Sequence, residues 1–576
     1  MTDPVLSVRD LSVQVATPAG AKTVLDGLSF DLMPGETLCL AGESGSGKSM
    51  TALAIMGLLP KPMCRIAGGS VRLGETELVG LSDAGYRQIR TARVAMIFQE
   101  PMTSLNPLMT VQQQLTETLL EHGVCSRAQA PGRALQLLRD VQLTEPERRL
   151  KQYPHELSGG MRQRVMIAIA LACDPEVLIA DEPTTALDVT VQAEILDLIR
   201  NLQRDHGTAV LLITHDMGVV AETADRVVIL RHGQEVESAP VRDLFAAPQS
   251  AYAQELLAAV PRLGSAPARP EKPQGDTVLD VDELSVRFDV KGGLLNRVKA
   301  RVHAVEDVSF SIRAGETLAL VGESGCGKST IGKALLGLVP WDGSVSVMGR
   351  QIRGLGPAGL KPVRRDIQMV FQDPGASLDA RMTVGDQVAE PLLIHGIASG
   401  SELKDRAEHL FRRVGLSPDM MTRYPHEFSG GQRQRINIAR ALSLSPKVIV
   451  ADESVSALDV SVQAQVLDLL QELQDEDGLA FLFISHDMAV IEQVADRVMV
   501  MRLGQVVEEG PRDAVLRDPR HRYTRRLLSA VPVPDPTRIR PERIETESLG
   551  SPIWPVGQGP AKLALQEIAQ GHRVAS

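Results

Sequence analysis

Cysteine, aromatic residues and positive charge are all scarce in this sequence, and each shortage argues against a class of function. The 576 residues contain five cysteines, which show no CxxC or His/Cys pairing of the kind that binds zinc or an iron–sulfur cluster. Aromatic residues make up 3%, so stacking surfaces for single-stranded nucleic acid are few. Lys and Arg total 61 against 72 Asp and Glu, and the net charge of −11 has the wrong sign for binding a phosphate backbone. We therefore expect no nucleic-acid partner.

Long apolar runs are also missing. No stretch is long enough to cross a bilayer, and the first residues, MTDPVLSVRD, lack the basic and apolar segments of a signal peptide. We therefore expect a chain that remains in the cytoplasm with reduced thiols. Its hydrophobic fraction of 43% and charged fraction of 23% are typical of globular proteins, and its length is too great for one hydrophobic core.

What the sequence does contain is a long internal repeat. The segment GETLCLAGESGSGKS (35–49) returns as GETLALVGESGCGKS (315–329), and YPHELSGGMRQR (153–164) returns as YPHEFSGGQRQR (424–435). Further on, ADEPTTALDVTVQAEILDL (180–198) returns as ADESVSALDVSVQAQVLDL (451–469). Because the copies lie so far apart, each repeat is a whole domain rather than one turn of a solenoid.

The repeat sets the expected domain boundaries. We predict a first domain over 1–262 and a second over 278–536, joined by a linker over 263–277 that is rich in Pro, Gly and Ala. Residues 537–576 lose periodicity and gain Pro and Gly, which predicts a mobile tail.

Within each half, short apolar runs alternate with helical stretches. The runs Thr37–Ala41, Val177–Ala180 and Ala209–Ile213 predict buried strands of a mostly parallel α/β sheet. Residues of about 105–155 and 378–425 lack such runs, which predicts a helical subdomain in each half.

The first chemical motif is a phosphate loop. Residues 42–49 (GESGSGKS) match GxxxxGK[ST] between an apolar strand and a helix-compatible run, and 322–329 (GESGCGKS) repeat the match. The glycines allow backbone N–H groups to turn towards phosphate oxygens, and the following helix adds its positive dipole end. At Cys326 inside the second loop, a small neutral role is favoured over redox regulation.

The second motif is a pair of adjacent carboxylates at the end of an apolar run. Asp181 and Glu182 follow one run, and Asp452 and Glu453 follow its repeat. Because neighbouring residues of a strand face opposite ways, one carboxylate can hold magnesium while the other polarises the attacking water. On its own, such a pair is more often an ordinary surface feature; the upstream phosphate loop reverses that preference.

The third block, Ser158-Gly159-Gly160 within LSGG, reads alone as a serine-capped helix start. With it, the order of motifs resembles the ATP-binding cassette (ABC) family over nearly all of 5–262 and 278–535. The order, which occurs twice, is a phosphate loop, a glutamine after a strand (Gln99, Gln372), LSGG or FSGG, an Asp-Glu pair, a SALD-type turn and a late histidine (His215, His486). The resemblance implies an α/β fold: two tandem P-loop NTPase domains, each a RecA-like core with a β-rich N-terminal part and a helical subdomain.

The resemblance also implies the residues of an ATP- and Mg²⁺-dependent hydrolase. Glu182 and Glu453 resemble the general bases, and His215 and His486 the γ-phosphate contacts. ATP contacts are expected from Gly42, Glu43, Ser44, Gly45, Ser46, Gly47, Lys48, Ser49, Gln99, Ser158, Gly159, Gly160 and Asp188, and from Gly322, Glu323, Ser324, Gly325, Cys326, Gly327, Lys328, Ser329, Gln372, Ser429, Gly430, Gly431, Asp459 and Phe288. The expected Mg²⁺ ligands are Ser49, Gln99 and Asp181 in one half and Ser329, Gln372 and Asp452 in the other.

Family members close head to tail around two ATP molecules, which implies that each site here borrows from both halves. The first phosphate loop would face Ser429, and the second would face Ser158. One departure concerns adenine: the second half offers Phe288 for stacking, whereas the first has Val15.

A second, weaker repeat indicates the kind of transporter. Segment 251–263 returns in weak form as 521–536. Segment 521–536 and the insertion 290–310 resemble parts of ATPases that serve dipeptide, oligopeptide, glutathione and nickel importers, and we favour this interpretation over merely amphipathic surface helices. The importer interpretation implies a peripheral protein on the cytoplasmic side of the inner membrane, with two permease subunits and an extracytoplasmic solute-binding protein as partners. The alternative is a soluble tandem ATPase acting on ribosomes or DNA, which would call for a charged linker, zinc-binding cysteines or a basic surface.

Overall fold

The computed structural model describes residues 3–17, 20–100, 104–185, 187–267, 275–292, 297–456, 458–538 and 550–575. Contacts within the chain divide it into two units. Unit 1 comprises Met1–Leu187, Val191–Val260 and Pro532–Arg540, and unit 2 comprises Asp188–Thr190, Pro261–Val531 and Pro541–Ser576. Among the described residues, no helix combines the length and the apolar composition that a membrane span requires.

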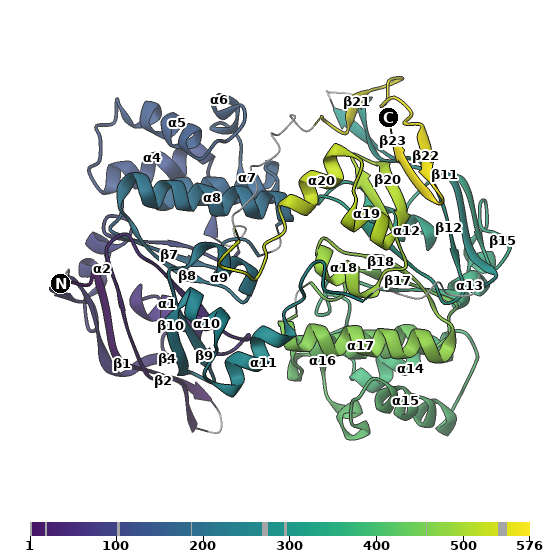
Figure 1. Cartoon of the computed structure of the whole chain (residues 1–576), viewed down its shortest axis with the longest axis horizontal. Coiled ribbons are helices and arrows are strands. Elements are labelled where there is room, and N and C mark those ends of the chain that lie inside the picture. Colours follow the sequence, from purple (N-terminus) through teal and green to yellow (C-terminus); the bar gives the residue numbers. More distant parts are fainter. Residues whose placement is uncertain are drawn as a thin grey trace. The chain divides into compact units, whose positions relative to one another are not determined.

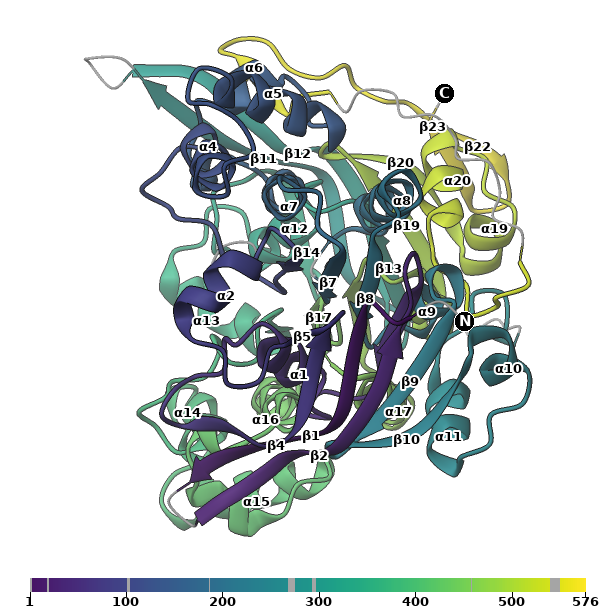
Figure 2. The same cartoon turned by 90° about the vertical axis from the view of Figure 1, so that its left-hand side faces the viewer.

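Unit 1 contains two sheets. The antiparallel sheet pairs, in order, β2 (Gly20–Leu32), β1 (Leu6–Thr17), β4 (Cys64–Leu73) and β5 (Thr76–Glu77). The second sheet pairs, in order, β10 (Gln234–Pro240), β9 (Arg226–Arg231), β3 (Thr37–Ala41), β8 (Ala209–Ile213), β7 (Val177–Asp181) and β6 (Val94–Ile97). All of its strand pairs are parallel except β9 with β10, and β3, β7 and β8 are buried along their whole length. Figure 2 shows β1, β2 and β4 running alongside β9 and β10.

The helices of unit 1 fall into two groups. Those packed on the sheets are α1 (Lys48–Ile55), α2 (Asp83–Ile89), α8 (Val189–His206), α9 (Met217–Thr223), α10 (Val241–Ala246) and α11 (Ala251–Ala259). The helical subdomain contains α4 (Val111–Glu121), α5 (Ala130–Asp140), α6 (Pro146–Arg149) and α7 (Gly159–Ala170), and α4, α5 and α6 lie together in Figure 1. A capping box formed by Thr110 and Gln113 begins α4. The predicted helical subdomain is confirmed, with no strand among the described residues of 105–155.

Unit 2 repeats this architecture with additions. Its antiparallel sheet pairs β15 (Arg350–Gln351), β14 (Asp342–Val347), β11 (Thr277–Gly292), β12 (Arg297–Arg313) and β21 (Ile553–Pro555). Its mostly parallel sheet pairs β16 (Ile367–Val370), β17 (Val448–Asp452), β18 (Ala480–Ile484), β13 (Thr317–Val321), β19 (Arg497–Arg502), β20 (Gln505–Pro511), β23 (His572–Ala575) and β22 (Leu565–Ala569). The helices are α12 (Lys328–Leu335), α13 (Pro357–Asp366), α14 (Val384–Ile394), α15 (Ser401–Arg413), α16 (Gly430–Leu442), α17 (Val460–Asp477), α18 (Met488–Val494), α19 (Arg512–Arg517) and α20 (Arg522–Ser529).

The described part of the tail differs from the expected mobile segment. Residues 550–575 form β21, β22 and β23, which extend both sheets of unit 2. Where β23 pairs with β20, the fully buried Glu508 carboxylate lies 2.9 Å from His572 Nε2 and also accepts the Arg520 N–H at 2.8 Å. The segment lacks periodicity of its own, because its structure comes from pairing with strands far away in the sequence.

Candidate functional site

Four adjacent parallel strands of unit 1 end at the same edge of the sheet, and each is followed by predicted site residues. The phosphate loop follows β3, His215 follows β8, Asp181 and Glu182 lie at the end of β7, and Gln99 follows β6. The corresponding strands of unit 2 are β13, β18, β17 and β16, which lead to residues 322–329, His486, Asp452 with Glu453, and Gln372. This edge, at the carboxyl ends of the strands, is where open α/β sheets bind ligands.

Glycine is required at the start of each phosphate loop by the closeness of a neighbouring strand. A Cβ on Gly42 would lie 2.2 Å from the Leu230 carbonyl oxygen, and one on Gly322 would lie 2.3 Å from that of Met501. At the other end of the loops, Gly47 (φ 103°) and Gly327 (φ 111°) cap α1 and α12 in a left-handed conformation. The loop therefore turns tightly into a helix N-terminus, which is an anion-binding arrangement.

Each loop lysine is buried and folded back on its own loop. Lys48 Nζ donates to the carbonyl oxygens of Gly42 at 2.7 Å and Glu43 at 2.8 Å. Lys328 Nζ donates to those of Gly322 at 2.8 Å and Glu323 at 3.0 Å. A buried ammonium group at the mouth of the loop supplies the charge that neutralises a triphosphate.

A serine hydroxyl and an aspartate meet beside each loop. Ser49 Oγ donates to Asp181 Oδ1 at 3.0 Å, and Ser329 Oγ donates to Asp452 Oδ1 at 2.8 Å. Burial raises the pKa of Asp181 to about 6, with Glu182 adding to the shift and the Ser49 hydroxyl opposing it, and burial likewise raises the pKa of Asp452. Hydroxyl and carboxylate oxygens are the hard ligands that Mg²⁺ prefers, so these residues fit the expected metal.

Glu182 lies at the centre of a hydrogen-bonded cluster. Gln99 Nε2 donates to Glu182 Oε2 at 2.9 Å, and His215 Nδ1 lies 3.1 Å from Glu182 Oε1. Burial disfavours the charge on Glu182, but the hydrogen bond and charge of His215 outweigh it and lower the pKa to about 2. Its φ of 45° is a strained conformation for a non-glycine residue, of the kind that clusters at active sites.

The second carboxylate cluster repeats the first with small differences. Gln372 Nε2 donates to Glu453 Oε2 at 2.6 Å, and Glu453 also has a φ of 45°. His486 Nδ1 lies 3.6 Å from Glu453 Oε1, which is farther than its counterpart in unit 1. Burial again opposes ionisation, but His486 and the other partners lower the pKa of Glu453.

Sequence reasoning missed one residue of these clusters. The Thr185 hydroxyl donates to Glu182 Oε2 at 2.8 Å, whereas the equivalent Ser456 hydroxyl donates to the backbone oxygen of Glu453 at 2.9 Å. A threonine in a turn carries no signal of this contact, because the contact depends on how the turn folds back on the carboxylate.

Ser158 and Ser429 are the N-caps of helices, as the LSGG and FSGG segments predict when they are considered alone. Ser158 begins α7 and its Oγ accepts the Met161 N–H at 3.4 Å, while Ser429 begins α16 and accepts the Gln432 N–H at 3.3 Å. The second glycine of each signature is closely packed: a Cβ on Gly160 would lie 2.8 Å from the Val191 side chain, and one on Gly431 would lie 2.2 Å from that of Val462. Backbone N–H groups at the first turn of each helix form a second candidate anion site.

Other predicted residues lie before helices, within strands and inside the second loop. Asp188 immediately precedes α8, and Asp459 is the N-cap of α17. Phe288 lies on β11 with 39% of its surface exposed, and Val15 occupies β1. Cys326 is buried, and burial raises the pKa of its thiol, which supports a neutral role in the second loop.

Two copies of a phosphate loop with a buried lysine, a serine–aspartate pair and a glutamate bonded to a glutamine are typical of a tandem P-loop nucleotide hydrolase. Comparison with known proteins adds the family: the model described as "ABC transporter" matches residues 25–185 and 305–456. This chain therefore belongs to the ABC transporter family and is an ATP hydrolase of that type. A second model, described as "Oligopeptide/dipeptide transporter, C-terminal region", matches residues 236–285 and 507–551.

Similar full-length proteins are known from several bacteria. The chain is 51% identical to proteins named "Glutathione import ATP-binding protein GsiA" in Escherichia coli (strain K12) and in Shigella boydii serotype 4 (strain Sb227). It is 50% identical to the protein of the same name in Pectobacterium atrosepticum. Each alignment covers 99% of this chain and 96% of the relative. Nothing in these relatives supports the alternative of an ATPase that acts on ribosomes or DNA.

Proposed function

We propose that this chain is the ATP-hydrolysing subunit of an importer for glutathione or a closely similar small peptide. The observation that carries the proposal is the presence of two sets of candidate site residues, one in each half of the chain. The segment that follows each set, 236–285 or 507–551, matches the oligopeptide/dipeptide transporter model. Glutathione enters the proposal because the relatives at 50–51% identity are named for its import.

The geometry of the clusters supports the roles that the family resemblance implies. Glu182 is held in its ionised form and oriented by His215 and Gln99, so it can accept a proton from the water that attacks the γ-phosphate. Lys48 neutralises the phosphates at the mouth of the loop. Mg²⁺, when bound with ATP, neutralises charge that develops on the phosphate oxygens, and Ser49, Asp181 and Gln99 are the residues that would hold it. Unit 2 has the same set.

We propose further that the two halves close head to tail around two ATP molecules. A phosphate loop surrounds a triphosphate from one side only, and a capped helix start such as that of α16 or α7 offers free N–H groups for the other side. In this arrangement Ser429 completes the first site and Ser158 the second. ATP then stabilises the closed state by binding it more tightly than the open one, and hydrolysis releases it.

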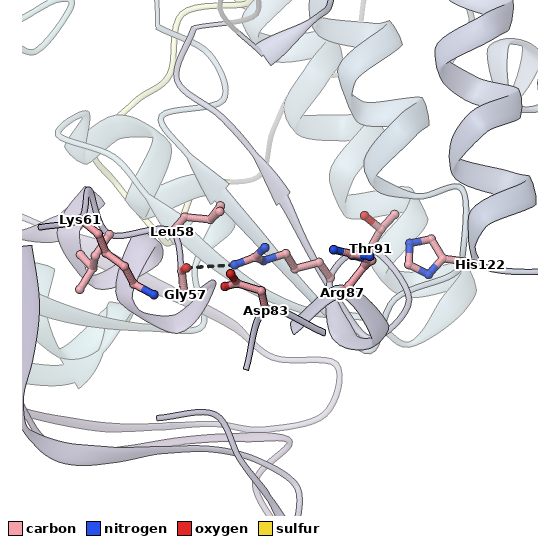
Figure 3. A pocket seen from close by; sticks show the side chains of 9 residues that line it. Gly57, Leu58, Lys61, Asp83, Arg87, Thr91 and His122 are labelled. Carbon is pink, nitrogen blue, oxygen red and sulfur yellow. Dashed lines mark hydrogen bonds between the residues drawn. The ribbon is translucent and has the colours of Figure 1, made fainter. Parts of the chain in front are cut away.

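A basic pocket of unit 1 suits the docking of a permease subunit (Figure 3). The pocket has a volume of about 550 Å³ and lies between residues 57–61, α2 and His122, the residue that caps α4 of the helical subdomain. Arg90 donates to the Gly57 carbonyl oxygen at 2.9 Å, the dashed bond in Figure 3, while Lys61 and Arg87 add two further positive charges. Asp83 is the one carboxylate in the lining, so the pocket favours an acidic segment.

Unit 2 carries part of this arrangement of charges, at Arg364 and Lys361. Arg364 donates to the Leu336 carbonyl oxygen at 3.2 Å, as Arg90 does to that of Met56 at 2.9 Å, and Lys361 lies one turn earlier on α13. His395 caps α14 as His122 caps α4, and its pKa is lowered by burial and by Lys361 and Arg365. We place a second docking seat at these residues of unit 2, so that the chain would bind two permease subunits. It would then be peripheral on the cytoplasmic side of the inner membrane, with a solute-binding protein on the other side.

Reconstitution tests the proposal. The chain, its permeases and the solute-binding protein are placed in proteoliposomes, and ATP hydrolysis is measured with glutathione, with dipeptides and without solute. We expect glutathione to stimulate hydrolysis several-fold and ATP to drive its accumulation. Stimulation by none of these solutes, or co-sedimentation of the chain with ribosomes instead of membranes, contradicts the proposal.

A charge-reversal variant tests the docking seats within the same assay. Arg87→Glu combined with Lys361→Glu is expected to leave hydrolysis by the isolated subunit unchanged, because neither side chain belongs to the ATP site. Stimulation by glutathione and retention of the subunit on the permease membranes are expected to fall at least about tenfold, as like charges across an interface cost several kcal/mol. Normal coupling in this variant would remove the seats while leaving the importer proposal intact.

A further inference from the structure

A tyrosine from each C-terminal helix binds the backbone of the phosphate loop in its own unit. In unit 1, Tyr252 on α11 is 5% exposed, and its hydroxyl accepts the Glu43 N–H at 3.3 Å. In unit 2, Tyr523 on α20 is 4% exposed, and its hydroxyl accepts the Glu323 N–H at 3.1 Å. The two tyrosines are equivalent in the sequence repeat, so the contact occurs independently twice.

The residue that each tyrosine binds is the second of the loop, and the loop lysine binds the same residue from the other side. The Tyr523 hydroxyl accepts the N–H of Glu323, and Lys328 Nζ donates to the Glu323 carbonyl oxygen at 3.0 Å. Tyr252 and Lys48 do the same at Glu43, where the lysine bond is 2.8 Å. Each lysine also donates to the carbonyl oxygen of the preceding glycine, at 2.8 Å for Gly322 and 2.7 Å for Gly42. The peptide between the first and second loop residues is therefore fixed at its N–H by the tyrosine and at its C=O by the lysine.

An arginine at the end of a core strand packs its guanidinium over each tyrosine ring. Arg231, the last residue of β9, lies with its guanidinium carbon 4.5 Å from the centre of the Tyr252 ring. Arg502, the last residue of β19, lies 5.5 Å from that of Tyr523. Burial and nearby acidic charge raise the pKa of Tyr523, so its hydroxyl stays protonated. A chain of contacts thus runs from the end of the core strand, through the arginine and the tyrosine, to the phosphate loop.

We propose that Tyr252 and Tyr523 are positioning residues of the two ATP sites, which hold the start of each phosphate loop in the conformation that receives the triphosphate. The C-terminal segments are thereby a structural part of the ATP sites, in addition to any role in transport. An N–H group that is fixed before ATP arrives lowers the cost of ordering the loop on binding. Loss of the hydroxyl therefore weakens ATP binding and leaves the chemical step, which depends on Glu182 and Glu453, largely unchanged.

Tyrosine-to-phenylalanine variants test this inference, because they remove the hydroxyl and keep the ring. We expect Tyr252→Phe and Tyr523→Phe each to weaken binding of a non-hydrolysable ATP analogue about three- to tenfold at one of the two sites, the size of one lost hydrogen bond. The double variant is expected to weaken both sites. In steady-state kinetics, KM for ATP is expected to rise while kcat stays within about twofold.

Tyr86→Phe is the matched control. Tyr86 is also buried and carries Arg90 over its ring at 4.9 Å, but its hydroxyl donates to the Leu78 carbonyl oxygen, whereas those of Tyr252 and Tyr523 accept N–H groups of the loops. The inference is wrong if Tyr86→Phe raises KM for ATP as much as Tyr252→Phe and Tyr523→Phe do. It is also wrong if Tyr252→Phe and Tyr523→Phe lower kcat and leave KM unchanged, because the two tyrosines would then have a merely structural role.

Hydrogen exchange gives a readout that does not depend on turnover. We expect the Glu43 amide to exchange faster in Tyr252→Phe, and the Glu323 amide faster in Tyr523→Phe, with the rest of α11 and α20 unchanged. Wild-type protection of these two amides in the variants overturns the inference even if ATP binding changes. General loss of protection across the helices overturns it as well, because the variant would then act through folding.

Discussion

At the scale of single residues, each candidate site contains two neighbouring carboxylates, and their surroundings shift their pKa values in opposite directions. Burial dominates at Asp181 and raises its pKa to about 6, whereas the partners of Glu182 overcome burial and lower its pKa to about 2. The difference follows from their contacts: Asp181 meets an uncharged serine, and Glu182 meets a histidine. Environments that separate the pKa values of two close acids are typical of catalytic pairs with divided roles.

The catalytic role of the glutamates is testable by removing their charge alone. Glu182→Gln and Glu453→Gln are expected to retain ATP binding but to lower kcat about 100-fold, because glutamine cannot accept the proton of the attacking water. ATP affinity is measured by calorimetry and turnover by phosphate release. Wild-type turnover in either variant would show that another group activates the water at that site.

At the scale of secondary-structure elements, the sequence predicts what local pattern determines. The runs predicted as strands at Thr37–Ala41 and Ala209–Ile213 are β3 and β8, because an apolar run that is buried on both faces leaves little choice of structure. The strands of the tail escaped prediction, since β23 is stabilised by β20 rather than by its own pattern. Tyr252 escaped as well: a tyrosine in an apolar helix looks like an ordinary core residue, and only the fold places its hydroxyl at the phosphate loop.

The first hairpin of unit 2 contains a buried charge cluster that predicts a pH dependence. Glu306 on β12 is flanked by Arg287, with Nε 3.0 Å away, and by His303, with Nδ1 2.7 Å away. Burial opposes its charge, but these two partners lower the pKa of Glu306 below its ordinary value. Because the folded-state pKa is the lower one, the stabilisation is present above the unfolded pKa of about 4.3 and is lost as the pH falls through the folded value.

Glu306→Gln is therefore expected to lower the free energy of unfolding by about 1–3 kcal/mol near neutral pH, since it leaves the Arg287 guanidinium and the buried His303 ring without their carboxylate partner. The deficit is expected to shrink progressively below about pH 4.3. Urea unfolding at a series of pH values measures it. Glu283→Gln is the control: its carboxylate pairs with Lys562 at 2.8 Å on an exposed surface, where solvent screens the pair, so a much smaller change is expected. A deficit in Glu306→Gln that does not change with pH would contradict the assignment.

At the scale of the whole molecule, each unit has its own set of candidate ATP-site residues around a phosphate loop. Each unit also has a helix that begins at a signature serine. Unit 1 has its loop, its carboxylates and Ser158, and unit 2 has its loop, its carboxylates and Ser429. The duplication leaves two arrangements: each signature serine serves its own loop, or each serves the loop of the other half. In the proposed head-to-tail arrangement, neither half would hydrolyse ATP alone.

Crosslinking distinguishes the two arrangements. In a background with the five native cysteines replaced, the pairs Ser44→Cys with Ser429→Cys and Ser324→Cys with Ser158→Cys are expected to react with a short thiol-to-thiol reagent when ATP is present without Mg²⁺. The pair Ser44→Cys with Ser158→Cys, within one half, is the control and is expected to stay unlinked. The linked chain is detected by its altered mobility on a denaturing gel. Efficient linking of the control pair and none of the other two would mean that each loop meets its own signature, and the head-to-tail closure proposed for this ATPase would be wrong.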